Sequence, residues 1–175
     1  AAKPQIAVDP TIVGSHIVIA LQSIVSRNAD PTDQIVVSVT SFETSSTAFN
    51  VIPQTVVLKG TVRTLSDETR DLAEKRLEEI ARKTGDVFGA NVDPVYTRGY
   101  PVMTNSVDQT EFAASVAKSV SGYCEEAPLV MGGEDFSYMA IERPGAYILI
   151  GNGDSAPVHN PNYNFNDEAI SIGCS

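Results

Sequence analysis

Apolar residues recur at helical spacing in two stretches of the first hundred residues. After Asp9-Pro10 they repeat every three or four positions, which predicts a helix from about Pro10 to Ser26. An Asp followed by Pro at the first helical position is typical of a helix start. A second helix is predicted after Ser66, with Asp67 and Glu68 in its first turn, where acids favour the helix dipole.

β-branched and aromatic residues fill two stretches between these helices, residues 35–42 and 55–64, and predict two strands. In the second, Val56, Leu58 and Val62 share one face and mostly polar side chains share the other. This alternation favours an antiparallel sheet with one open face. Residues 91–100 predict a third strand.

The predicted order is therefore helix, strand, strand, helix, strand. One further strand in front would complete the split βαβ pattern of ferredoxin-like folds. We therefore expect an α+β domain at 1–100 that lacks its first strand. The start "AAKPQ" has no initiator Met, so we also expect the chain to begin inside a longer polypeptide.

Glycine, proline and asparagine in residues 99–108 indicate a domain crossing. Beyond it the pattern predicts a helix at 109–120, a glycine turn at 132–135 that leads into a helix from Phe136, and an apolar strand at 146–150. Asn166 or Asp167 is expected to cap a last short helix.

Composition excludes several functions. The net charge of −10 gives no electrostatic reason to bind nucleic acid or anionic lipid. The longest apolar runs, 17–21 and 146–150, are too short to span a membrane. Cys124 and Cys174 have neither zinc-site nor disulfide spacing, which favours a reducing compartment such as the cytoplasm.

His159 is the first candidate for chemistry. It lies between Pro157 and Pro161 in a polar loop after an apolar stretch, and imidazole is a frequent metal ligand and general base. An ordinary loop histidine is the alternative. His16, on the first predicted helix, is interpreted as a partly buried structural residue with a local hydrogen bond.

Two further stretches contain polar groups that suit ligand binding. In "MGGEDFSYM" (131–139), Gly133 allows close backbone approach, and Glu134 and Asp135 add carboxylates; a helix-capping turn is the alternative. Asn50 and Arg63 suit a substrate carboxylate, since a guanidinium matches two oxygens. The alternative there is a turn Asn and a solvated Arg.

A hydrolytic metal site needs about three or four protein ligands. The chain has no HxxEH or GxSxG motif and no second usable histidine. Any metal site must therefore be completed by residues outside this chain.

Four stretches together resemble the M20 metallopeptidases: "AAKPQIAVDP" (1–10), "FNVIPQTVVLKGTVRT" (49–64), "MGGEDFSYM" (131–139) and "GNGDSAPVHNPNYNFNDEA" (151–169). They stand in the family's order and intervals, over nearly the whole chain. The chain is most similar to the amidohydrolase branch, which comprises hippurate hydrolases, N-acyl-amino-acid amidohydrolases and plant auxin-conjugate hydrolases.

The resemblance implies a ferredoxin-like lid and dimerisation domain at 1–100. Residues 101–175 would be the C-terminal segment of an α/β zinc-peptidase-like catalytic domain. The complete enzyme would hold two divalent ions (zinc, manganese or cobalt), which this chain alone need not bind. It would hydrolyse N-acyl amino acids to a carboxylic acid and an amino acid.

The same resemblance gives each candidate residue a role. His159 matches the last metal ligand, and Gly133 matches a glycine whose backbone contacts the substrate carboxylate region. Asn50 and Arg63 match a lid pair that reaches the partner subunit's site and holds that carboxylate or the reacting group. Glu134 and Asp135 are expected to shape the site without a catalytic step.

The family's general base, lid histidine and remaining ligands precede Ala1 and are absent here. The expected partners are therefore the missing N-terminal half, a second copy through the lid, and a small N-acyl amino acid. Without that half the chain is expected to be inactive. The alternative is a stand-alone, non-catalytic dimerisation or binding module.

Overall fold

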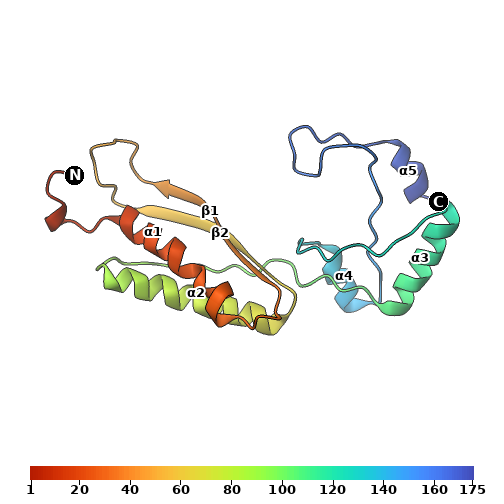
Figure 1. The fold of residues 1–175 in the computed structure, drawn as a ribbon, viewed down its shortest axis with the longest axis horizontal. Coiled ribbons are helices and arrows are strands. Elements are labelled where there is room, and N and C mark those ends of the chain that lie inside the picture. Colours follow the sequence, from red (N-terminus) through yellow and green to blue (C-terminus); the bar gives the residue numbers. More distant parts are fainter. The chain divides into compact units, whose positions relative to one another are not determined.

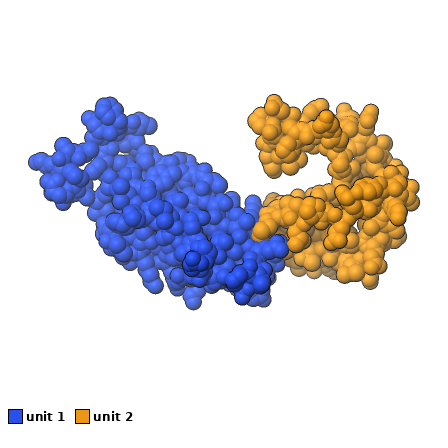
Figure 2. Space-filling model, viewed as in Figure 1, with its two compact units in different colours: residues 1–99 blue, residues 100–175 orange.

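The computed structural model describes residues 1–175, which form two compact units. Unit 1 is Ala1–Gly99 and unit 2 is Tyr100–Ser175, coloured separately in Figure 2.

Unit 1 packs two helices against a β-hairpin (Figure 1). The helices are α1 (Pro10–Leu21) and α2 (Asp67–Val87), and the strands are β1 (Ile35–Thr44) and β2 (Val56–Thr64). The strands pair antiparallel, as predicted, from Ile35 opposite Thr64 to Thr44 opposite Val56, with an irregularity between Val39 and Ser41. Two single turns, η1 (Pro4–Ile6) and η2 (Ile24–Asn28), flank α1.

One apolar core lies between the two helices α1 and α2 and the hairpin of β1 and β2. It contains side chains from α1, the turn after it, β1 and α2: Val13, Ile17, Leu21, Ile24, Val37, Ala73 and Ala81. The prediction that β2 has one apolar face is confirmed, because Leu58 and Val62 pack against this core whereas Lys59 and Arg63 are exposed.

Both predicted helix starts in unit 1 are confirmed. The Asp9 carboxylate accepts a hydrogen bond from the Thr11 backbone N–H at 2.9 Å, and the Ser66 hydroxyl accepts one from the Thr69 N–H at 3.1 Å. These bonds satisfy backbone donors that the first helical turn leaves free.

The first helix ends earlier than predicted. The α-helix stops at Leu21, and Ile24–Asn28 form a π-helical turn in which the Ala29 N–H bonds to the Ile24 carbonyl at 2.9 Å. Arg76 of α2 donates to the Asn28 side chain at 3.0 Å. A long-range tie to α2 therefore holds the chain in a wider turn than helical spacing predicts.

The predicted strand at 91–100 is wrong, because these residues have no strand. Side chains there alternate as a strand's would, with Val92, Pro94 and Tyr96 half-buried and their neighbours exposed. A strand also needs a neighbouring backbone for its ladder, and no backbone hydrogen bond joins this segment to β1 or β2.

Unit 2 has three helices, α3 (Val107–Ser121), α4 (Phe136–Glu142) and α5 (Glu168–Gly173), joined by long irregular segments. The helices fall where the sequence predicts them. Asp167 is the N-cap residue of α5, but its side chain makes no capping bond; the Asn166 side-chain oxygen instead accepts from the Glu168 N–H at 3.1 Å. None of the helices in either unit combines the length and apolar character that a membrane crossing requires.

The predicted strand at 146–150 is also wrong. Instead of a ladder, the Asn105 side chain pairs with the backbone of Tyr147: its oxygen accepts from the Tyr147 N–H at 2.7 Å and its amide donates to the Tyr147 carbonyl at 3.0 Å. The Ser106 N–H bonds to the Gly145 carbonyl at 2.9 Å. One asparagine therefore takes the place of a neighbouring strand, and no sheet forms in unit 2.

Candidate functional site

His159 lies at the tip of a tight turn in unit 2. The Asn160 N–H donates to the Pro157 carbonyl at 3.1 Å, which makes His159 the third residue of a four-residue turn. Its φ of 69° is the left-handed value that a type II turn requires at this position. His159 is the only non-glycine residue with such a φ, and its imidazole is exposed.

A second turn follows immediately. The Asn160 side chain accepts from the Asn162 N–H at 2.9 Å, and the Asn160 carbonyl accepts from the Tyr163 N–H at 2.9 Å. The histidine is thus presented by two consecutive turns with a proline in each. Proline fixes its own φ and so reduces the entropy lost when the loop is ordered.

Asn152 joins the two ends of this loop. Its amide donates to the Asn164 carbonyl at 2.8 Å and to the Ser155 hydroxyl at 2.7 Å, and its oxygen accepts from the Asn166 N–H at 2.7 Å. Sequence reasoning missed this residue, because "GNG" (151–153) also fits an ordinary turn. Only the contacts twelve and fourteen residues away reveal its role.

Gly133, Glu134 and Asp135 lead into α4. Gly133 and Glu134 are half-buried and Asp135 is exposed. The Glu134 carbonyl accepts from the Ser137 backbone N–H at 3.2 Å and also from the Ser137 hydroxyl, and Ser137 is fully buried. These bonds fix the backbone at Glu134, whereas the Asp135 side chain makes no capping hydrogen bond to α4.

The carboxylate of Glu134 faces Tyr147. Burial raises the pKa of the Tyr147 phenol, and a hydrogen bond to Glu134 together with the charges of Glu134 and Asp135 raises it further. The Tyr147 ring also lies 5.9 Å from that of Phe136, the first residue of α4. Tyr147 is a second residue that sequence reasoning did not select.

Asn50 and Arg63 lie in unit 1 and are both exposed. Arg63 is near the end of β2, opposite Val36, and makes no ion pair. Asn50 lies in the loop that precedes β2, where its carbonyl accepts from the Ala1 amine at 3.2 Å. A strand rises about 3.3 Å per residue, so Arg63 lies on the order of 20 Å beyond Val56. The structure does not bring these two side chains together in one copy of unit 1.

A groove of 570 Å³ between α1 and α2 contains none of the candidate residues. His16 lines it, with Ile80, Lys83 and Phe88 among its neighbours. The sequence interpretation of His16 needs correction: the residue is exposed rather than partly buried, and its ring lies 4.7 Å from that of Phe88.

No group of three or more histidine, cysteine, aspartate or glutamate side chains in this chain could hold a metal ion. His159 is the one imidazole in unit 2, and its neighbours in the loop are asparagines, prolines and a valine. The donors present therefore do not by themselves fit a one- or two-metal centre.

The family comparison decides which enzymes this chain is related to. The model of peptidase family M20/M25/M40 matches residues 5–175. The chain belongs to this family. This confirms the resemblance stated from the four sequence stretches.

Two curated M20 relatives illustrate the match. The chain is 35% identical to the hippurate hydrolase of Campylobacter jejuni, over 99% of this chain and 46% of the relative. It is 33% identical to the N-acetyldiaminopimelate deacetylase of Enterococcus faecalis, over 99% and 46%. The chain spans less than half the length of these relatives.

Two solved structures share the fold. One, from methicillin-resistant Staphylococcus aureus, has a TM-score of 0.79 and 34% identity, over 99% of this chain and 44% of that one. The other is the YXEP protein of Bacillus subtilis, described as a dinuclear metal binding peptidase from the M20 family. It has a TM-score of 0.71 and 27% identity, over 94% and 43%.

Proposed function

We propose that residues 1–175 are the carboxy-terminal part of a dinuclear-metal amidohydrolase that cleaves N-acyl amino acids, such as hippurate-like amides. The carrying observation is the M20 match over residues 5–175, which extends to a hippurate hydrolase and an N-acetyldiaminopimelate deacetylase. Both names describe hydrolysis of an N-acyl amino acid. The products would be a carboxylic acid and an amino acid.

In this proposal His159 supplies one ligand to the metal centre, and the other ligands come from outside residues 1–175. Support comes from its exposed imidazole, held at the tip of a turn whose loop is closed by Asn152. Because one imidazole cannot hold a metal centre, this chain alone is inactive.

The ferredoxin-like lid function belongs to unit 1 and the catalytic-domain segment to unit 2. Two copies of the protein form a homodimer through the lid of each, which is unit 1. The exposed Arg63 guanidinium of one copy holds the substrate carboxylate in the partner's site. Its lack of an internal ion pair leaves the guanidinium fork free for two carboxylate oxygens. Asn50, at the other end of β2, contacts the reacting group rather than the same carboxylate.

Gly133, Glu134 and Asp135 shape the substrate side of unit 2. The Gly133 backbone contacts the substrate carboxylate region, and the Ser137 hydroxyl fixes the adjacent backbone by donating to the Glu134 carbonyl. The cytoplasm is the proposed compartment, since Cys124 and Cys174 are both free and exposed.

The metal role is tested on the longest polypeptide that contains residues 1–175 in one reading frame, with residues 1–175 alone as the control. We expect the longer protein to bind two metal equivalents and hydrolyse hippurate, and the control to do neither. His159→Ala should remove about one metal equivalent and reduce turnover by more than about 100-fold. Unchanged metal content and rate would refute the assignment, and a longer frame without further histidines and carboxylates would favour the binding module.

The carboxylate role is tested in the same protein with hippurate and its neutral carboxamide. Arg63→Ala removes a charge-assisted hydrogen bond, so KM for hippurate should rise roughly 10- to 100-fold. The carboxamide should be affected much less. An equal loss for both substrates would refute the clamp, and Lys59→Ala on the same exposed face of β2 is the matched control.

A further inference from the structure

We propose that the groove between α1 and α2 in unit 1 binds an amphiphilic monocarboxylate, a molecule with one carboxylate and a linear apolar chain. This site goes beyond the proposed function, since none of the residues given a role there lines the groove. The carrying observation is an open, largely apolar groove whose one lysine, Lys83, makes no ion pair.

One face of each helix forms the groove. The two helices lie side by side against the hairpin (Figure 1). Their lining residues recur at spacings of three or four, as positions on one helix face do. On α1 these positions run from His16 to Ser23, and on α2 they run from Arg76 to Val87. The groove volume of 570 Å³ lies within the range of small-molecule sites.

The two ends of the groove differ in chemistry because the helices run antiparallel. At one end, His16 of α1 meets Phe88, which follows α2, with ring centroids 4.7 Å apart. At the other end, Nε of Arg76 in α2 donates to the side chain of Asn28, beyond the end of α1, at 3.0 Å. The first end is therefore closed by two rings and the second by a polar contact.

Apolar side chains line the groove from its middle to the end with the two rings. Ile80 and Phe88 pack against the core and also line the groove. Ile19 and Val87 line it with 69% and 79% of their surfaces exposed. Covering such surface with an apolar chain removes it from water, which is favourable in proportion to the area covered.

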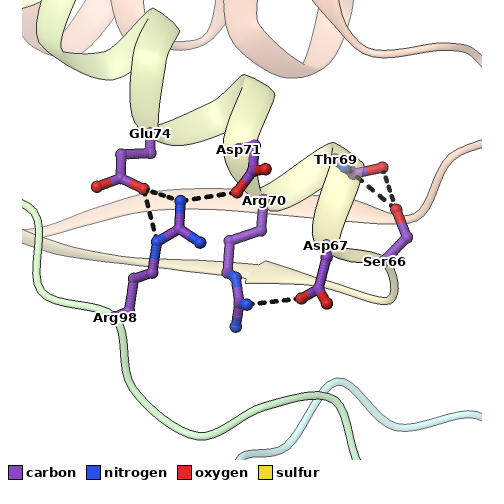
Figure 3. A network of polar contacts seen from close by, with 7 residues as sticks. All are labelled: Ser66, Asp67, Thr69, Arg70, Asp71, Glu74 and Arg98. Atoms are coloured by element: carbon purple, nitrogen blue, oxygen red, sulfur yellow. Dashed lines mark hydrogen bonds and ion pairs between the residues drawn. The ribbon is translucent and has the colours of Figure 1, made fainter.

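The arginines on and beside α2 are paired with carboxylates. Arg98 donates to Asp71 at 2.7 Å and also to Glu74, and Arg70 pairs with Asp67 at 2.6 Å (Figure 3). Exposed ion pairs of this kind contribute little stability, but they leave neither partner with an uncompensated charge. These arginines therefore do not attract an anion to unit 1.

The groove contains one positive charge that no carboxylate neutralises. Arg76 and Glu79, which both line it, form an ion pair at 2.6 Å. Lys83 is exposed and unpaired, and Thr84 beside it adds a half-buried hydroxyl to the same wall. An ammonium group is a compact point charge with three donors, which suits a single carboxylate. A free cation in an apolar groove, in a chain of net charge −10, therefore favours a ligand with one negative charge.

The position of Lys83 sets the direction and the length of the ligand. Long helical side chains lean toward the N-terminus of their helix, so we expect the ammonium over the turn at Glu79 and Ile80. From Ile80 to Phe88 an α-helix rises about 12 Å. A linear chain of about ten carbons spans this length. The carboxylate thus lies toward Arg76, and the chain follows the apolar wall to Phe88.

The binding test titrates the 175-residue chain with decanoate, below its micellar concentration, by isothermal titration calorimetry. Hexanoate keeps the carboxylate but lacks part of the chain, and decyltrimethylammonium keeps the chain but reverses the charge. We expect saturable binding of one decanoate, at least about tenfold tighter than that of either control ligand. Decanoate should also slow amide exchange in residues 16–23 and 79–88.

Four substitutions locate the ligand. Lys83→Gln removes the charge and should raise the Kd of decanoate roughly 10- to 100-fold, whereas Lys75→Gln, at an exposed α2 position outside the groove, should not change it. Ile19→Gln should raise the Kd about fivefold, and Ile12→Gln, at another exposed position of α1, is its control. All four side chains are exposed, so urea unfolding should show little change in stability.

Absence of saturable binding would overturn the proposal, as would equal affinity for decanoate and either control ligand. Equal effects of a groove substitution and its matched control would also overturn it. Affinity that falls as the protein concentration rises, together with a dimer in sedimentation, would identify a second copy as the occupant and refute the carboxylate. Neither His159 nor Arg63 is changed in any variant, so failure here leaves the tests of the proposed function unaffected.

Discussion

The side chain of Asn152 accepts a hydrogen bond from the backbone N–H of Asn166 at 2.7 Å, across the base of the loop that contains His159. The same amide donates to the Asn164 carbonyl, so one residue satisfies backbone groups on the returning limb of the loop. The position of His159 therefore depends on a residue seven positions before it as well as on its own turn.

Replacing Asn152 should loosen the His159 loop. Each of its hydrogen bonds contributes about 1 kcal/mol, so Asn152→Ala should lower the free energy of unfolding of unit 2 by about 1–3 kcal/mol. Amide exchange in residues 153–165 should become faster. Ser155→Ala, which removes only one partner of the same amide, is the control and should cost less. Unchanged exchange in Asn152→Ala would show that the amide does not close the loop.

His159 should tolerate glycine better than alanine. Its φ of 69° is strained for a residue with a Cβ atom but not for glycine. His159→Gly should therefore be more stable to urea than His159→Ala by about 1 kcal/mol. Replacing Val158, the preceding residue of the turn, with the same two residues is the control and should not favour glycine. The opposite order at position 159 would contradict the left-handed conformation.

Features that depend on neighbours in sequence were predictable. Asp9 and Ser66 cap helices because a side-chain oxygen reaches N–H groups two or three residues ahead, and both caps were predicted. The antiparallel pairing of β1 and β2 was also predicted, from the alternation of apolar and polar residues along β2. The M20 motifs identified the family because their order is itself a property of the sequence.

Features that depend on distant residues were not predictable. Residues 91–100 and 146–150 have the composition of strands, but composition cannot supply the partner strand that makes a ladder. Asn105 occupies the place of that partner for Tyr147. Likewise, nothing in "GNG" shows that Asn152 contacts Asn166, so the support of the His159 loop was found only in the structure.

Acid should weaken the start of α1 through Asp9. A hydrogen bond from the Thr11 hydroxyl, and then one from its backbone N–H, lower the pKa of this carboxyl below its ordinary value of 3.8. A lowered pKa means that the stabilisation is complete above the ordinary value and is lost as the pH falls through the folded-state value. The expected loss therefore lies below about pH 4.

The Asp9→Asn substitution removes the carboxylate charge but keeps the side-chain oxygen that caps α1, so it distinguishes the two effects. Asparagine keeps the acceptor oxygen, so helix stability at neutral pH should change little, whereas Asp9→Ala should cost about 1 kcal/mol. The part of the acid destabilisation that comes from Asp9 should vanish in both variants. Urea unfolding measured at several pH values checks this, and an unchanged acid profile would contradict the assigned hydrogen bonds.

Removing the charge of Glu134 should lower the pKa of Tyr147. Burial is the largest cause of its raised pKa, and the hydrogen bond and charge of Glu134 come next. Glu134→Gln should therefore move the phenol toward its ordinary value of 10.0 without reaching it. Phenolate absorbance is measured against pH, and Tyr147→Phe identifies which part of the signal belongs to Tyr147.

Asp135→Asn is the matched control, because Asp135 acts on Tyr147 only through its charge and is the last of the causes. It should lower the Tyr147 pKa less than Glu134→Gln does. An equal shift in the two variants would show that Glu134 does not hydrogen-bond the phenol, and would remove the support for its fixed position beside α4.

Gly85→Ala should destabilise unit 1, although alanine normally stabilises a helix interior by about 1 kcal/mol. An added Cβ would lie 2.4 Å from Cγ2 of Val92 and 3.0 Å from the Ala90 carbonyl oxygen. The segment after α2 must therefore move away from the helix, at a cost of about 1–3 kcal/mol. Amide exchange at residues 90–98 should become faster together with the loss of stability.

Combining Gly85→Ala with Val92→Ala removes the nearest atom, so the effects of the two substitutions on stability should be less than additive. A more stable Gly85→Ala protein would show that residues 90–92 do not lie against α2 in solution.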